Sequence, residues 1–183
     1  RDDTATRQRV VRTMFFLWLA MGIAFLASML HLGSPLRAFN SLNRVGASAL
    51  SNEIASGSLF FAVGGLWWLV AFMGKMPARL GQIWLAGTMV LGLLFVLAMT
   101  QVYQIETVPT WHNGYTTSTF FLTVLLVGPL FAALLLRIAG APCNGQVFAA
   151  ISAAALLASV AVVVMQSAAV AEIHSAIQQA REL

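Results

Sequence analysis

Charged residues are scarce in this sequence. Only 9% of its 183 residues are Asp, Glu, Lys or Arg, whereas a soluble domain carries about a quarter. Hydrophobic residues make up 60% of the chain, and the mean hydropathy is +0.85. Ten basic and six acidic side chains cannot keep this much apolar surface dispersed in water. The composition therefore excludes a soluble globular protein and places the chain in a bilayer.

Cysteine and histidine are also scarce. The one cysteine, Cys143, excludes an internal disulfide, and without a second thiol it excludes zinc or iron–sulfur ligation by cysteine pairs. None of the three histidines lies in the middle of an apolar run, so a haem held between histidines on facing helices is not expected. The basic residues are scattered between apolar runs, so the net charge of +4 predicts no nucleic-acid-binding patch.

Five apolar runs are long enough to cross a bilayer. About 20 apolar residues span its hydrocarbon core, and lipid offers no partner for unpaired backbone groups, so such runs form helices. The runs, none of which contains Asp, Glu, Lys or Arg, cover approximately residues 14–30, 54–73, 83–99, 120–136 and 147–165. The predicted fold is an all-α integral membrane protein, a polytopic helical bundle that forms one transmembrane domain over residues 1–183.

The basic residues predict the orientation of this bundle. Connectors alternate sides, and the side with more Lys and Arg faces the cytoplasm. Seven basic residues fall on one side: Arg1, Arg7, Arg9, Arg12, Lys75, Arg79 and Arg137. Three fall on the other: Arg37, Arg44 and Arg181. Aromatic belts agree, with Trp18, Trp67, Trp68 and Trp84 near the inner ends and Tyr103, Trp111 and Tyr115 near the outer ends. The N-terminal segment is therefore expected inside.

The first external connector predicts a short helix of its own. Ser34 and Pro35 form a helix start and Gly46 a stop, so we expect a helix over residues 35–45. Its apolar side chains fall on one side and its polar ones on another; the apolar set is Leu36, Phe39 and Leu42, and the polar set is Arg37, Asn40 and Arg44. This pattern is typical of an amphipathic helix lying in the membrane interface.

A candidate site lies where this connector leaves and re-enters the bilayer. His31 ends the first span and Glu53 begins the second, so the connector can bring them together at the outer boundary. Small residues that favour close helix packing run behind them: Ala20, Ala24, Ala27 and Ser28 before His31, and Ser56, Gly57 and Gly64 after Glu53. Oxidation of a quinol releases two protons and needs a base near each hydroxyl, so a carboxylate and an imidazole here predict a quinol site.

Plainer interpretations of the same residues stay open. Glu53 follows the capping candidate Ser51, so its charge can simply stabilise the first turn of a helix. His31 can anchor a helix end among lipid headgroups, and Arg37 and Arg44 can bind lipid phosphates. His112 is expected in an exposed loop and His174 in a solvated tail. For the protein as a whole, the alternatives to a quinol-oxidising subunit are a small transporter or channel and a purely structural anchor.

A longer block of sequence resembles a known family. Residues 31–57 read HLGSPLRAFNSLNRVGASALSNEIASG; SLFFAVGG follows, with TVPTW at residues 107–111 and VMQSAAVAEIHSAIQQA at 164–180. The sequence resembles the membrane anchor subunit of anaerobic dimethyl sulfoxide reductase, the DmsC family, over essentially its whole length. The resemblance implies a fold of about eight spanning helices. This protein, which begins at Arg1 without Met, is then expected to lack the first helix and the last few.

The resemblance also implies a function. Anchors of this family sit in the bacterial inner membrane, oxidise menaquinol and pass the electrons to an iron–sulfur subunit in anaerobic respiration. A molybdopterin catalytic subunit completes the complex, so the molybdopterin and iron–sulfur cofactors belong to the partners and no haem or metal is expected in this protein. A His and a Glu of the matching block are implicated in menaquinol oxidation, and they correspond to His31 and Glu53. Arg37 and Arg44 are kept as candidate neighbours of the quinol.

Overall fold

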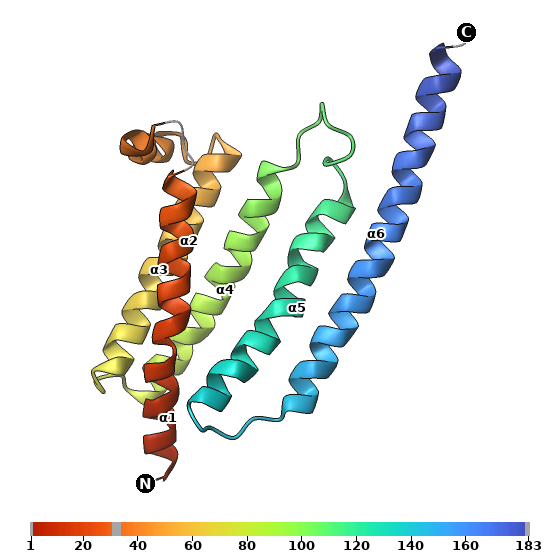
Figure 1. Ribbon diagram of the computed structural model, residues 1–183. Coiled ribbons are helices and arrows are strands. Elements are labelled where there is room, and N and C mark those ends of the chain that lie inside the picture. Colours follow the sequence, from red (N-terminus) through yellow and green to blue (C-terminus); the bar gives the residue numbers. More distant parts are fainter. Residues whose placement is uncertain (1, 31–33, 182–183) are drawn as a thin grey trace. The chain divides into compact units, whose positions relative to one another are not determined.

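The computed structural model describes residues 2–30 and 34–181, and these fold into helices joined by short connectors (Figure 1). The elements are α1 (Asp2–Thr13), α2 (Phe15–Leu30), the 3-10 helix η1 (Pro35–Arg44), α3 (Ala49–Phe72), α4 (Ala78–Val102), α5 (Gly114–Ile138) and α6 (Gly145–Arg181). Five helical segments are long and apolar enough to cross a membrane, the first formed by α1 and α2 together. The predicted all-α, polytopic membrane fold is confirmed.

Residue contacts divide the protein into two compact units, which are described separately. The first comprises Arg1–Val102 and Ala133–Cys143, and the second comprises Tyr103–Ala132 and Asn144–Leu183. The first unit holds α1 to α4 with η1, and therefore the predicted site. The second holds most of α5 and all of α6.

Helix α1 continues into α2 with a slight break at Met14. The Met14 N–H still donates to the Val10 carbonyl at 3.0 Å, and the Trp18 N–H donates to the Met14 carbonyl at 3.2 Å. The Val11 carbonyl accepts a hydrogen bond from Trp68 Nε1 of α3 at 2.7 Å. Gln8 Nε2 donates to the Phe72 carbonyl at 2.9 Å. These two bonds hold the polar helix α1 on the C-terminal half of α3.

Aromatic side chains of α2 fill glycine notches in α3. Trp18 and Phe25 are seven residues apart on α2, and Gly64 and Gly57 are seven apart on α3. A Cβ on Gly64 would overlap the Trp18 ring, and a Cβ on Gly57 would lie 3.1 Å from Phe25 Cζ. The two helices therefore run antiparallel, and each large aromatic side chain of α2 packs against a glycine of α3 that has no side chain.

This packing corrects two predictions. The small residues of α2, which are Ala20, Ala24, Ala27 and Ser28, are exposed rather than packed on α3. The glycines of α3 do form a close-packing face, but its partners are aromatic rings, because a ring fills a glycine notch and buries more surface than an alanine can. Trp18, expected in the inner aromatic belt, is buried over Gly64 for the same reason.

The other inner tryptophans tie the helix ends together through backbone carbonyls. Trp67 Nε1 donates to the Gly81 carbonyl at 2.8 Å, and Trp84 Nε1 donates to the Val63 carbonyl at 3.0 Å. With Val11 and Ala71, Trp67 forms a buried apolar cluster at this end of the first unit. Each of these two indoles thus adds a hydrogen bond between α3 and α4, and the N–H of each ring finds an acceptor away from water.

Replacing Trp67 with Phe should therefore destabilise the fold by about 0.5–1.5 kcal/mol, because the hydrogen bond between the Trp67 indole of α3 and the Gly81 carbonyl of α4 is lost. Trp111, which is 47% exposed, supplies the matched control. Thermal unfolding in detergent should show a clearly lower midpoint for Trp67→Phe and an almost unchanged midpoint for Trp111→Phe. Equal midpoints would show that the indole hydrogen bond contributes nothing.

The second unit is organised by the loop before α5. Asn113 caps this helix: its Oδ1 accepts the Thr116 N–H at 3.1 Å, and its Nδ2 donates to the Thr110 carbonyl at 2.9 Å. Gln166 of α6 also donates to the Thr110 carbonyl, at 3.4 Å. Helix α6 has 37 residues, which corresponds to about 55 Å. It is therefore longer than the roughly 30 Å hydrocarbon core requires, and its polar C-terminal part extends beyond it.

Candidate functional site

The connector between α2 and α3 is itself structured. Pro35–Arg44 forms a 3-10 helix rather than an α-helix, and it packs against both α2 and α3. Its apolar residues Leu36, Phe39 and Leu42 are spaced three apart, which matches the three residues per turn of a 3-10 helix. Phe39 is 76% exposed, as expected for a side chain that faces lipid in the interface.

A tight turn then leads into α3. Gly46 has a φ of +88°, a left-handed conformation that other residues rarely adopt. Its N–H donates to Asn52 Oδ1 at 2.6 Å, which joins the turn to the first turns of α3. Ser48 is the N-cap, and its hydroxyl accepts the Ser51 N–H at 3.4 Å.

This start of α3 overturns the capping interpretation of Glu53. Ser48, not Ser51, caps the helix, and Ser51 is itself buried in the first turn. Glu53 is the fifth residue of α3, beyond the first turn, where the effect of the helix dipole has largely faded. Both serines suit a cap by residue type, and Ser51 is excluded because the helix begins two residues before it.

Glu53 lies on the face of α3 that packs toward α2 and α4. Gly57 follows it by one helical turn, and a Cβ there would lie 2.7 Å from Phe95 Cε2 of α4. The Phe25 and Phe95 rings stack with their centroids 6.2 Å apart and their planes 20° apart. Glu53 is half-buried, and among the described side chains none forms an ion pair or hydrogen bond with its carboxylate. A half-buried carboxylate with no ion-pair or hydrogen-bond partner among the described side chains therefore lies one turn before Gly57, over which the aromatic pair is stacked.

Of the other predicted site residues, some are exposed and one lies outside the described part of the sequence. Arg37 and Arg44 are exposed on η1, which packs on the same two helices. His31 lies outside the described residues; α2 ends at Leu30 just before it. His112 and His174 are exposed on the second unit, in a loop and on α6 respectively, as expected from the sequence. Within the described ranges, no group of three or more His, Cys, Asp or Glu is arranged to hold a metal ion.

Two contributors to the site were not predicted from the sequence. Asn52 fixes the turn at Gly46, and Phe25 with Phe95 forms the aromatic pair. The seven-residue spacing shared by Trp18 with Phe25 and by Gly57 with Gly64 is the signal that could have found Phe25, but it does not point to Phe95 of α4. Nothing in the sequence distinguishes Asn52 from other polar residues near a helix start.

Chemically, the site combines a proton acceptor with an apolar, aromatic approach at the end of a helix bundle. Such a carboxylate can take a proton from a lipid-soluble hydroxyl compound that reaches it from the membrane. The fold and this site together define a class: a polytopic helical membrane protein with a half-buried carboxylate near one end of a spanning helix.

The comparisons with known proteins identify the family. The family model described as DMSO reductase anchor subunit (DmsC) matches residues 1–183. The protein belongs to this family, and it is a multi-pass protein of the bacterial inner membrane. Membership does not favour the transporter or channel alternative.

Individual relatives agree. The sequence is 65% identical over 181 residues to the YnfH subunit of an anaerobic dimethyl sulfoxide reductase of Escherichia coli, with 99% of this sequence and 64% of that protein covered. It is 58% identical to the C subunit of anaerobic dimethyl sulfoxide reductase from E. coli (97% and 62% covered) and 43% identical to the C subunit from Haemophilus influenzae (99% and 65% covered). It thus spans slightly less than two thirds of the relatives it matches. No solved structure matches the sequence.

Proposed function

We propose that this protein is the membrane-embedded part of a quinol-oxidising anchor in a molybdenum reductase of the dimethyl sulfoxide reductase type, and that menaquinol binds at Glu53. The observation that carries this proposal is the half-buried carboxylate, free of ion pairs to described residues, one turn from the stacked rings of Phe25 and Phe95. The names of the relatives, which are subunits of anaerobic dimethyl sulfoxide reductases, support the assignment to this kind of complex.

The residues present fit a quinol. Its flat, apolar ring system suits a site bordered by aromatic side chains and reached from lipid, and its hydroxyl groups need polar partners. Glu53 accepts a proton from one hydroxyl, and His31 hydrogen-bonds the other. Arg37 and Arg44, on the connector between them, are neighbours of the bound ring rather than proton acceptors.

Oxidation of one menaquinol releases two protons and two electrons. The protein's part is to take up the protons at the outer boundary through Glu53 and His31, and to hold the ring while it is oxidised. The electrons leave to an iron–sulfur partner subunit, which passes them to a molybdopterin catalytic subunit. The anchor therefore catalyses no complete reaction alone, and the metal cofactors belong to its partners.

The role of His31 can be tested separately from that of Glu53. His31→Arg should lower menaquinol oxidation by the assembled complex at least about 100-fold, since a permanent cation can neither accept a proton nor leave the quinol's surroundings neutral. His112→Arg, in an exposed loop, is the matched control and should retain full activity. Reduction driven by a soluble dye that donates directly to the partner subunits should be unchanged in both variants, and normal quinol oxidation by His31→Arg would remove His31 from the site.

A further inference from the structure

One face of the continuous α1–α2 segment changes from cationic to apolar along its length. Arg9 and Arg12 occupy this face on α1, and apolar side chains continue it on α2 at helical spacings of three and four residues. The apolar members are Phe16, Leu19, Ile23, Leu26 and Leu30, which are between 45% and 74% exposed. We call these seven residues the α1–α2 stripe.

The opposite face of the same segment packs within the first unit. Val11, Trp18 and Phe25 lie there, and they contact the apolar cluster and the glycine notches of α3. The hydrogen bonds from Gln8 and to the Val11 carbonyl fix α1 on α3. The stripe is therefore held in a defined orientation, facing away from α3.

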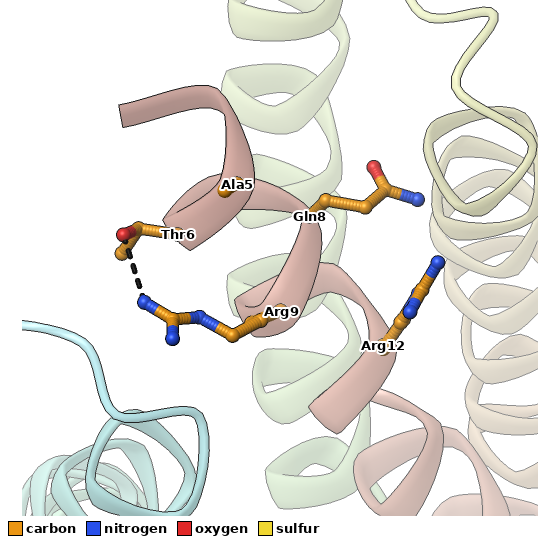
Figure 2. A pocket seen from close by; sticks show the side chains of 5 residues that line it. All are labelled: Ala5, Thr6, Gln8, Arg9 and Arg12. Carbon is orange, nitrogen blue, oxygen red and sulfur yellow. Dashed lines mark hydrogen bonds between the residues drawn. The ribbon is translucent and has the colours of Figure 1, made fainter. Parts of the chain in front are cut away.

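An open pocket of about 470 Å³ lies over the cationic end of the stripe, lined by Ala5, Thr6, Gln8, Arg9 and Arg12. Figure 2 shows Arg9 and Thr6 on one side of the small Ala5 side chain and Gln8 and Arg12 on the other. Arg9 Nη2 donates to Thr6 Oγ1 at 3.1 Å, which orients that guanidinium. Among the described carboxylates, none forms an ion pair with Arg9 or Arg12, so both charges are available to an anion.

We propose that the α1–α2 stripe binds one anionic phospholipid, with its phosphate in the pocket at the cationic end of the stripe and an acyl chain along Phe16, Leu19 and Ile23. Guanidinium groups match phosphate oxygens in charge and geometry. Basic pockets at the cytoplasmic ends of membrane helices suit such headgroups, and the sequence places α1 on that side. A free phosphate would contact the pocket alone. A lipid would place its headgroup in the pocket and its acyl chain on the apolar residues of α2 that follow the pocket along the stripe.

The test is lipid retention by the complete anchor purified with its partner subunits. Native mass spectrometry should show one phosphatidylglycerol retained in preference to phosphatidylcholine. Arg9→Gln/Arg12→Gln should weaken this retention about 30-fold. Lys75→Gln/Arg79→Gln removes the same charge from exposed positions at the connector between α3 and α4 and should retain the lipid.

Three outcomes would overturn the proposal. Equal losses in the two double variants would mean that general surface charge attracts the lipid. Unchanged retention in Arg9→Gln/Arg12→Gln would mean that the lipid binds elsewhere. Glycerol phosphate binding as tightly as phosphatidylglycerol would mean that the pocket selects a soluble anion and the apolar residues play no part.

Discussion

Glu53→Gln is expected to lower menaquinol oxidation by the assembled complex at least about 100-fold, the usual contribution of a positioned acid–base group. Glutamine has nearly the shape of glutamate but cannot accept the proton. The loss should therefore appear in quinol-driven turnover, while the complex still assembles in the membrane. Quinol-driven reduction and dye-driven reduction, measured on the same membranes, separate the anchor's step from the chemistry of the partner subunits.

Glu106→Gln is the matched control for this variant. Glu106 is an exposed carboxylate in the loop between α4 and α5, in the second unit, so its loss should leave quinol oxidation within about twofold of wild type. If Glu53→Gln oxidised menaquinol normally, or if dye-driven reduction fell with it, Glu53 would not be the proton acceptor.

The second large effect is expected at Gly64. A Cβ there would overlap the Trp18 ring and lie 2.8 Å from Thr88 Cγ2 of α4. Neither neighbour can move freely, because Trp18 is buried and Thr88 Oγ1 donates to the Trp84 carbonyl at 3.0 Å. Gly64→Ala should therefore destabilise the bundle by about 1–3 kcal/mol.

The adjacent Gly65 offers a control that differs only in the helix face. A Cβ on Gly65 meets no atom within 4 Å, so Gly65→Ala should be neutral or slightly stabilising through its higher helix propensity. Thermal unfolding of the purified anchor should separate the two variants by several degrees. Equal midpoints would contradict the account of the glycine notches.

The helices were predictable because a long apolar segment that crosses a bilayer has few conformations other than a helix in which its backbone groups are hydrogen-bonded. Every predicted apolar run lies within or overlaps one of the five spanning segments, since lipid demands internally satisfied backbone groups whatever the partners are. The helix in the connector was predictable from its apolar spacing. Its 3-10 geometry is consistent with a spacing of three, which Leu36, Phe39 and Leu42 already display in the sequence.

The helix partners were less predictable. Small residues on α2 suggested one seam, but rings seated over Gly57 and Gly64 decide the packing. The face of a membrane helix that packs on a neighbour depends on the complementary shapes of both helices. The sequence of one apolar segment shows the shape of only one of the two surfaces. Likewise Ser48 and Ser51 are equivalent as sequence caps, and only the turn at Gly46, held by Asn52, selects Ser48.

For the candidate site, the sequence located Glu53 and its connector but not its surroundings. The nearness of η1 to α2 and α3, the stacked pair of Phe25 and Phe95, and the position of Glu53 beyond the first helical turn are all features of the folded structure. The roles of His31 and Glu53 in quinol oxidation remain predictions, supported by the chemistry of the two side chains and by the family.

The most direct test of the central claim is a binding titration with a fluorescent quinol-analogue inhibitor on membranes that contain the anchor and its partner subunits. Saturable quenching with one site per anchor is expected in wild type and in Glu106→Gln, and loss of that quenching is expected in Glu53→Gln. Equal binding to wild type and Glu53→Gln would contradict a quinol site at Glu53, and absence of binding to wild type would leave the protein a purely structural anchor.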